Sequence, residues 1–261
     1  MAGIGTVIHV DRVSKAFGAN SESRVQALRA VTLDVQRREL LSILGPTGCG
    51  KTTLLRIISK LDTPDDGSIE IAPSTNGSPN SLGFLFQQHA LFPWMTVEKN
   101  ILFGLRAAGL GKEEARARCL ECLRLVGLTD SAKSFPYELS GGMQRRAALA
   151  RTIAPRPDIV LMDEPFSGLD IATARALYDE MLRIHSHSEM TIVFVTHNIE
   201  EAVFLASRVI VMGTSPGRIV AEVPVDLPRP RDRLDRRFVE KILAVREFFV
   251  KANPTEERST T

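Results

Sequence analysis

The sequence predicts an α/β fold: a phosphate-loop core with a mostly parallel sheet, an N-terminal antiparallel β layer and an inserted helical subdomain. Three observations predict it. A glycine-rich loop joins the apolar run 40–44 to a helix-forming run, which is the context of a phosphate-binding loop. Apolar runs at 158–164 and 191–195 alternate with helical patterns, as in βαβ units. The segment from about 96 to 155 has a helical pattern almost throughout.

The early part of the chain is rich in predicted strands. Segments with the alternating or short apolar pattern of a strand lie at 7–13, 31–35, 68–71 and 82–86. Polar loops at 18–23 and 73–80 and a turn at 63–67 separate them, because Gly, Pro, Asn, Asp and Ser gather there. This part forms the β layer, which lies beside the glycine-rich loop.

The later part of the chain continues the βαβ series. Helices are predicted at about 172–185 and 199–206, and strands follow them at 191–195 and 208–212. A proline-bearing connector spans 224–230. A last helix then buries one face, which is made of Phe238, Ile242, Val245 and Phe249.

Length and composition indicate an ordinary globular protein. A chain of 261 residues forms one large domain or two small ones, and 44% hydrophobic and 25% charged residues suit a packed core. We expect one domain over 1–235, with the helical subdomain at about 96–155 inserted in it. The C-terminal helix and a disordered tail, 254–261, make up residues 236–261.

Charge, hydropathy and cysteine content indicate which partners and which cellular location the protein is expected to have. A net charge of +2 gives no sign of nucleic acid or a membrane surface. No apolar stretch approaches the length of a membrane span, and residues 1–6 lack the pattern of a secretory signal. Three cysteines, an odd number, suit a reducing compartment. The cytoplasm is the expected location.

The glycine-rich loop predicts a nucleotide phosphate site. It reads Gly-x-x-x-x-Gly-Lys-Thr, and its candidate residues are Gly45, Pro46, Thr47, Gly48, Cys49, Gly50, Lys51, Thr52 and Thr53. Backbone N–H groups and the helix N-terminus surround an anion. Lys51 reaches the β- and γ-phosphates, and the Thr52 hydroxyl takes a place on Mg²⁺. An accidental match in a chain of this length has odds of roughly one in a hundred.

Three more side chains follow predicted parallel strands, where such sheets place their ligands. Asp163 suits the water shell of Mg²⁺, and Glu164 can polarise an attacking water as general base. The alternative is that this pair only begins a turn before Pro165. His197 follows strand 191–195 and would contact the γ-phosphate, although a lone histidine is more often structural.

A second candidate anion site lies at Ser140-Gly141-Gly142. Ser140 is a good N-cap, and a strong helical run follows the two glycines. The segment is either an anion-binding helix end or simply a capped helix. The residue pattern leaves both interpretations open.

The cysteines allow a structural and a chemical interpretation. Cys119 and Cys122 form C-x-x-C within a helical pattern, without a second pair nearby, so core-facing thiols are favoured over zinc. Cys49 precedes a helix N-terminus, where thiol pKa values tend to fall. We therefore expect Cys49 to react with maleimide, and ATP to protect it.

Several motifs lie far apart in the sequence and follow one another in a characteristic order. Through them the chain resembles the ATP-binding subunit of an ABC transporter. They are GPTGCGKTT, Gln87, LSGGM, the strand ending in Asp163-Glu164, Ser167-Gly168-Leu169-Asp170 and His197. The resemblance covers roughly residues 5–230, and LSGG at this spacing is highly specific to that family. It implies ATP and Mg²⁺ as ligands, and a peripheral location on the cytoplasmic face of the cell membrane.

The resemblance also implies partners and further site residues. Two copies would pair head to tail, and each ATP would lie on one copy's loop and be closed by Ser140-Gly141-Gly142 of the other. Phe17 matches an aromatic that stacks on adenine; the alternative is an ordinary core phenylalanine. Gln87 matches the glutamine that links Mg²⁺ and the attacking water to the membrane subunit. Asp170 matches an aspartate that crosses the dimer.

The chain departs from the family at Arg145, where glutamine is common. Among subgroups it is most similar to importers of the nitrate, sulfonate or taurine type, through residues 87–97, 215–219 and 226–231. Importers of this type work with a separate integral membrane permease and a substrate-binding protein outside the membrane. The apolar segment around Trp94 would form a surface for the permease, unless Trp94 is buried.

Two other functions remain open from the sequence. One is a soluble ABC ATPase that acts on DNA or ribosomes, which the near-zero charge and single motif set disfavour. The other is an exporter ATPase, which the importer-like residues after Gln87 disfavour. The transported solute depends on other chains.

Overall fold

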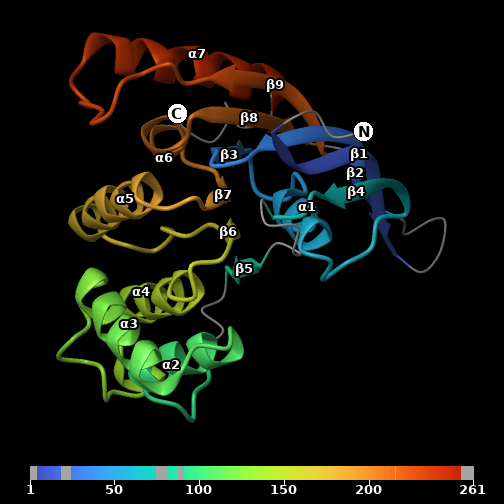
Figure 1. Cartoon of the computed structure of the whole chain (residues 1–261). Helices are drawn as coiled ribbons and strands as arrows, with labels where there is room; N and C mark the ends of the chain where they lie inside the picture. Colours follow the sequence, from blue (N-terminus) through green and yellow to red (C-terminus); the bar gives the residue numbers. More distant parts are fainter. Residues whose placement is uncertain (1–4, 19–24, 75–80, 88–90, 215, 254–261) are drawn as a thin grey trace. The chain divides into compact units, whose positions relative to one another are not determined.

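The computed structural model describes residues 5–18, 25–74, 81–87, 91–214 and 216–253 (Figure 1). It divides the chain into two compact units. We call residues 1–80 and 191–261 the phosphate-loop unit, and residues 81–190 the central unit. Parts of the loops expected at 18–23 and 73–80, and the tail expected at 254–261, lie outside the described residues. The domain bounds proposed from the sequence stay predictions.

The N-terminal β layer is an antiparallel sheet in the order β2-β1-β4. Its strands are β1 Thr6–Phe17, β2 Val25–Gln36 and β4 Asp66–Ile71. The first two are longer than the alternating pattern predicted. The end of β1 is held by Asp65, whose carboxylate accepts a hydrogen bond from Ala16 N at 2.9 Å. The predicted antiparallel layer is confirmed.

The other sheet of the phosphate-loop unit is mainly parallel and deeply buried. β3, Leu40–Leu44, lies between β7, Thr191–Thr196, and β8, Arg208–Gly213, and runs parallel to both. β9, Arg218–Pro224, pairs antiparallel with β8. β9 was not predicted, because its alternation of half-buried and exposed residues is short and ends at a proline. The predicted mostly parallel sheet is confirmed.

In its described residues, the phosphate-loop unit also contains three helices. They are α1 Lys51–Ile58, α6 Ile199–Leu205 and α7 Arg236–Ala252. α7 packs on α6, β8 and β9 (Figure 1). Phe238, Val245 and Phe249 are buried, as the predicted apolar face requires, whereas Ile242 is half-buried.

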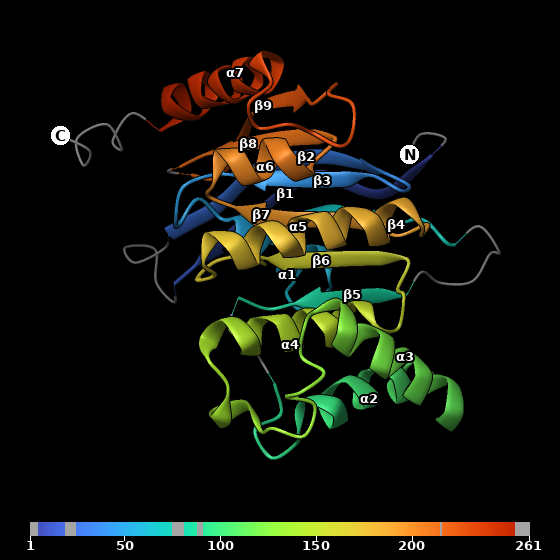
Figure 2. The same cartoon turned by 90° about the vertical axis from the view of Figure 1, so that its left-hand side faces the viewer.

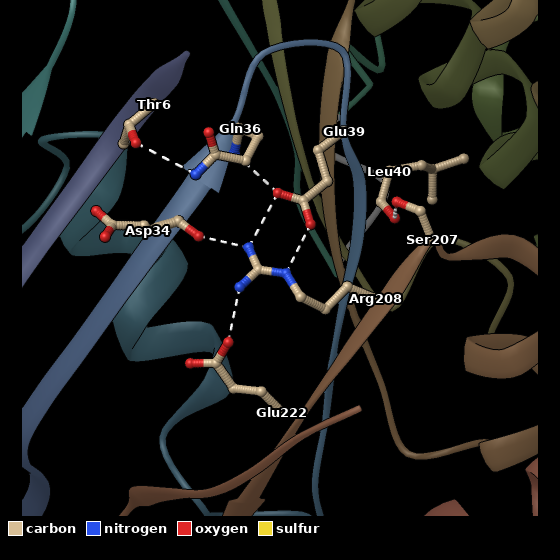
Figure 3. A network of polar contacts seen from close by, with 8 residues as sticks. All are labelled: Thr6, Asp34, Gln36, Glu39, Leu40, Ser207, Arg208 and Glu222. Carbon is tan, nitrogen blue, oxygen red and sulfur yellow. Dashed lines mark hydrogen bonds and ion pairs between the residues drawn. The ribbon is translucent and has the colours of Figure 1, made fainter. Parts of the chain in front are cut away.

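A cluster of polar contacts around Arg208 joins the strands of the phosphate-loop unit (Figure 3). The Arg208 guanidinium, at the start of β8, donates to both carboxylate oxygens of Glu39 at 2.8 and 3.0 Å. It also donates to Glu222 of β9 at 2.8 Å and to the carbonyl of Asp34 in β2. Because an arginine fork holds several acceptors in fixed directions, this cluster ties the β2–β3 turn to β8 and β9.

The central unit combines a two-stranded parallel pair with helices (Figure 2). β5, Leu82–Leu85, pairs with β6, Ile159–Asp163. The helices are α2 Val97–Ala107, α3 Lys112–Leu125, α4 Gly141–Ile153 and α5 Ile171–Ser186, with a 3₁₀ turn at Pro136–Glu138. α2, α3 and α4 contact one another. β6 is fully buried, but most of β5 is only half-buried, contrary to the expected buried strand.

The thiols of α3 belong to the core of the central unit. Cys119 and Cys122 are buried, as the core interpretation predicts. Burial raises the pKa of Cys119 to about 12 and that of Cys122 to about 11, so both stay protonated near neutral pH. Within the described ranges, none of the helices has the length and apolar character needed to span a membrane.

Candidate nucleotide-binding site

The phosphate-binding loop connects β3 to α1 and curls around its own lysine. Gly48 and Gly50 have φ values of 82° and 91°, a region that glycine adopts without strain. The Lys51 side chain is buried, and its Nζ donates to the carbonyls of Gly45 at 2.7 Å and Pro46 at 2.8 Å. The ammonium therefore lies inside the curve of the loop. Thr52 is exposed and Thr53 half-buried on the first turn of α1.

Gly217, which was not among the predicted site residues, supports this loop. A Cβ on Gly217 would lie 2.2 Å from the Cys49 carbonyl oxygen and 2.5 Å from that of Ala27. Gly217 N donates to Ala27 O at 3.2 Å, and its own carbonyl accepts from Arg29 N at 2.9 Å. Only glycine permits this approach. In the sequence, the signal for such a contact is an isolated glycine that interrupts two stretches of ordinary residues.

Replacing this glycine with alanine is expected to weaken nucleotide binding. In Gly217→Ala the new methyl group must push the loop or β2 aside, since both neighbours are backbone oxygens. Overpacking costs about 1–3 kcal/mol, and we expect the Kd for an ATP analogue to rise roughly tenfold. Equilibrium titration of each variant with the ATP analogue measures this Kd. Gly111→Ala is the control, because a Cβ there meets nothing within 4 Å. Equal affinity in both variants would contradict the supporting role.

Cys49 is packed inside the loop, which corrects one expectation. Its side chain is fully buried, and Sγ lies 3.9 Å from Lys51 Nζ. A Cβ on Gly45 would lie 2.5 Å from this sulfur, so the thiol fills the space beside Gly45. This burial contradicts the access that the expected maleimide labelling of Cys49 requires. Position next to a helix N-terminus predicts thiol acidity, but packing decides access.

The end of β7 brings His197 to the phosphate-binding loop. Leu44 pairs with Thr196 in the parallel register, and Gly45 N donates to Thr196 O at 3.3 Å. The residues that follow these two strands therefore lie at one sheet edge, and His197 is exposed there. Asn198 fixes the next turn, because its side chain accepts from Glu201 N at 3.2 Å and caps α6.

Phe17, the candidate for adenine stacking, ends β1 and is 46% exposed. The alternative of a core phenylalanine is therefore wrong. Lys15 Nζ lies 5.6 Å from the centroid of the Phe17 ring. An exposed ring beside a cation offers a flat face to an electron-rich base.

In the central unit, Asp163 is the last residue of β6, and Glu164 and Gln87 follow the paired strands β6 and β5. Leu85 is in register with Met162, so the residues after both strands lie at one edge. Asp163 is 2% exposed, whereas Gln87 is exposed and Glu164 half-buried. Glu164 has a φ of 48°, a conformation that non-glycine residues adopt only where their surroundings impose it. Such strain is frequent at active sites.

The segment Ser140-Gly141-Gly142 forms the N-terminus of α4. The Ser140 hydroxyl accepts from Met143 N at 3.3 Å and so caps the helix. Ser140 and Gly141 are exposed, and a Cβ on Gly141 would meet nothing within 4 Å. The N-cap predicted at Ser140 is thus confirmed. An anion at this exposed helix end stays a prediction.

Asp170 has a role within its own chain. Its carboxylate caps α5 by accepting from Thr173 N at 3.0 Å. The hydrogen bonds from Thr173 lower the pKa of Asp170, which is exposed. The contact across a dimer that the sequence predicts for this carboxylate stays a prediction.

Comparisons with known proteins agree with these motifs. The ABC transporter family model matches residues 28–167. Among curated relatives, the uncharacterised ABC transporter ATP-binding protein MJ0412 of Methanocaldococcus jannaschii is 45% identical over 89% of this chain and 87% of its own length. The taurine import ATP-binding protein TauB of Rhizobium johnstonii is 42% identical, covering 85% and 86%. The aliphatic sulfonates import ATP-binding protein SsuB of Bacillus licheniformis is 43% identical, covering 84% and 85%.

A solved structure is also similar to this chain. It is the dimeric post-hydrolysis state of the ATP-binding cassette MJ0796 bound to ADP and Pi, with a TM-score of 0.75 and 31% identity. The match covers 85% of this chain and all of the solved chain.

Proposed function

The chain belongs to the ABC transporter family as an ATP-binding protein that hydrolyses ATP for transport, and on that premise we propose that it drives import of a small anion through a separate permease. The observation that carries this proposal is the identity of 42–43% to taurine and aliphatic sulfonate import proteins over 84–85% of the chain. We propose a sulfonate, taurine or nitrate as the solute class. The substrate-binding protein is a further, indirect partner.

The chemistry assigned to the site follows from its side chains. Lys51 and the loop N–H groups bind the β- and γ-phosphates, and His197 contacts the γ-phosphate. Glu164 accepts the proton of the attacking water. The donor set of Thr52, Gln87 and Asp163 (a hydroxyl, an amide carbonyl and a carboxylate) consists of the hard oxygens that Mg²⁺ prefers. When bound, Mg²⁺ neutralises the charge that develops on the phosphates.

We further propose that two copies work as a head-to-tail dimer. The solved cassette MJ0796 is dimeric and carries ADP and Pi. In this chain the exposed N-terminus of α4, with Ser140 and Gly141, is suited to close on the γ-phosphate of ATP held by the second copy. One isolated subunit is then expected to bind ATP but hydrolyse it poorly.

An aromatic surface of the central unit supports the assignment of a membrane partner. Trp94 is 69% exposed, so its buried alternative is wrong, and Phe103 is 47% exposed. The Phe92 ring joins them, with centroids 5.6 Å from Trp94 and 4.9 Å from Phe103. Exposed aromatic clusters of this kind favour protein contacts.

A buried asparagine holds the segment that presents Trp94. Asn100 of α2 accepts from Phe92 N at 2.8 Å, and its amide donates to the carbonyls of Met95 and Thr96 at 3.1 and 3.0 Å. Its side chain is fully buried. The turn is therefore pre-organised, and a partner would lose little entropy in binding it.

Trp94→Ala tests the membrane-partner assignment. Truncating a central interface aromatic costs about 2 kcal/mol or more, so we expect binding to the permease to weaken roughly thirtyfold and uptake to fall, with basal ATPase activity unchanged. Copurification from membranes, solute uptake and phosphate release measure these effects.

Leu234→Ala is the matched control, because Leu234 is 91% exposed in the other unit. Recovery of the wild-type chain with ribosomes or DNA and without an integral membrane protein would contradict transport. Normal copurification of Trp94→Ala would overturn the assignment of this surface alone.

A further inference from the structure

Arg145 of α4 joins the two segments that carry Gln87 and Glu164. Its side chain is 2% exposed. Nε donates to Pro165 O at 3.0 Å, one terminal nitrogen donates to Asp163 O at 3.2 Å, and the other donates to Gln87 O. A buried guanidinium is costly unless its donors are satisfied. These carbonyls satisfy it within the central unit.

The carbonyls that Arg145 binds flank Glu164 on both sides. Asp163 precedes Glu164 and Pro165 follows it, so one planar group fixes the backbone before and after the carboxylate. Glu164 has a φ of 48°, and strained backbone of this kind persists only where several contacts determine it. Arg145 supplies two such contacts. The third hydrogen bond of Arg145 fixes the backbone of Gln87, which follows β5 at the same edge of the β5–β6 pair as Glu164.

The side chains next to Arg145 on α4 hold different segments. The Gln144 amide donates to Pro136 O at 2.9 Å, ahead of the helix, and Arg146 donates to Val126 O at 2.7 Å, after α3. Of these three consecutive side chains, Arg145 is the one whose hydrogen bonds reach the ends of β5 and β6. It therefore connects the helix that begins at Ser140 with the segments of Gln87 and Glu164.

We propose that Arg145 is a positioning residue for ATP hydrolysis, which holds Glu164 and Gln87 in register with the N-terminus of α4. This inference rests on the proposed function of Glu164 as general base. Glutamine, common at this position in the resembling family, has a single donor nitrogen and no fork that matches the spread of three carbonyls. Lysine keeps the charge but lacks the planar fork.

Three variants test the proposal by steady-state kinetics. Arg145→Gln is expected to lower kcat for ATP by about 10–100-fold, because a small misplacement of a catalytic group can cost about 10²-fold. KM and the Kd for ATP should change less than about twofold, since the carbonyls that Arg145 binds belong to the segments of Gln87 and Glu164, whose assigned role is in hydrolysis. Arg145→Lys should recover part of kcat. Arg118→Gln is the control: Arg118 also donates to a backbone carbonyl, that of Ala154, away from this edge.

A double-mutant cycle with Glu164→Gln separates positioning from mere stability. Residues that act as a unit give non-additive losses. Arg145→Gln is thus expected to reduce the residual single-turnover rate of Glu164→Gln by less than about twofold. Multiplicative losses, or wild-type kcat in a folded Arg145→Gln protein, would overturn the proposal. Should Arg145→Gln unfold, the same cycle is run with Arg145→Lys. Absence of ATPase activity in the wild-type dimer, by contrast, would refute the proposed function itself.

Discussion

Glu164→Gln is expected to abolish ATP turnover and leave ATP binding intact. The amide has nearly the same shape as the carboxylate but cannot accept the proton of the attacking water. General-base catalysis is typically worth about 10²–10⁴-fold, so phosphate release should fall by at least that factor. With hydrolysis blocked, the ATP-bound dimer should accumulate, because only turnover reopens it.

Phosphate release and size-exclusion chromatography in ATP measure the two outcomes. Glu114→Gln is the control, as an exposed glutamate on the first turn of α3. Normal hydrolysis in Glu164→Gln would refute its role as base. Loss of ATP binding in the same variant would instead assign Glu164 to the binding of the nucleotide.

Lys51→Ala is expected to remove ATP binding itself. The Lys51 ammonium bonds the carbonyls of Gly45 and Pro46, and on binding ATP it exchanges them for phosphate oxygens. Hydrogen bonds to charged groups contribute about 1.5–3 kcal/mol each. Loss of the ammonium therefore weakens binding by about 10²-fold or more. It also leaves the two loop carbonyls without this donor.

A thermal-shift experiment distinguishes binding from folding in this variant. A ligand at 100 times its Kd stabilises a protein by about 2.7 kcal/mol, so saturating ATP should raise the Tm of the wild type but not that of Lys51→Ala. Lys112→Ala, at the exposed start of α3, should behave like the wild type. An equal ATP-induced shift in Lys51→Ala would contradict the assigned role.

Long apolar or strongly periodic segments were predictable element by element. Four elements lie within a few residues of their expected positions. They are the strand before the phosphate loop, the strands that end at Asp163 and Thr196, and the helix that begins at Arg236. Such segments form because burial demands one pattern over their whole length. β9 was missed because half of its residues face solvent and its alternation is brief.

Exposure of single side chains was harder to predict. Phe17 and Trp94 each allowed a buried and an exposed interpretation, and both are exposed. Cys49 was expected to react with maleimide, yet its side chain is fully buried. Whether a residue at the end of an element is covered depends on segments distant in sequence, which local periodicity does not describe.

By itself, the sequence determined the family, the phosphate-binding loop and the identity of the chemical groups, because these depend on residues close together or in one fixed order. Which distant backbone groups meet depends on the tertiary structure. Gly217 lies against the Cys49 carbonyl, and Arg145 reaches Gln87, 58 residues earlier, and both sides of Glu164. Such contacts arise from packing in three dimensions, where a glycine's missing Cβ or an arginine's fork acts on partners that no local pattern specifies.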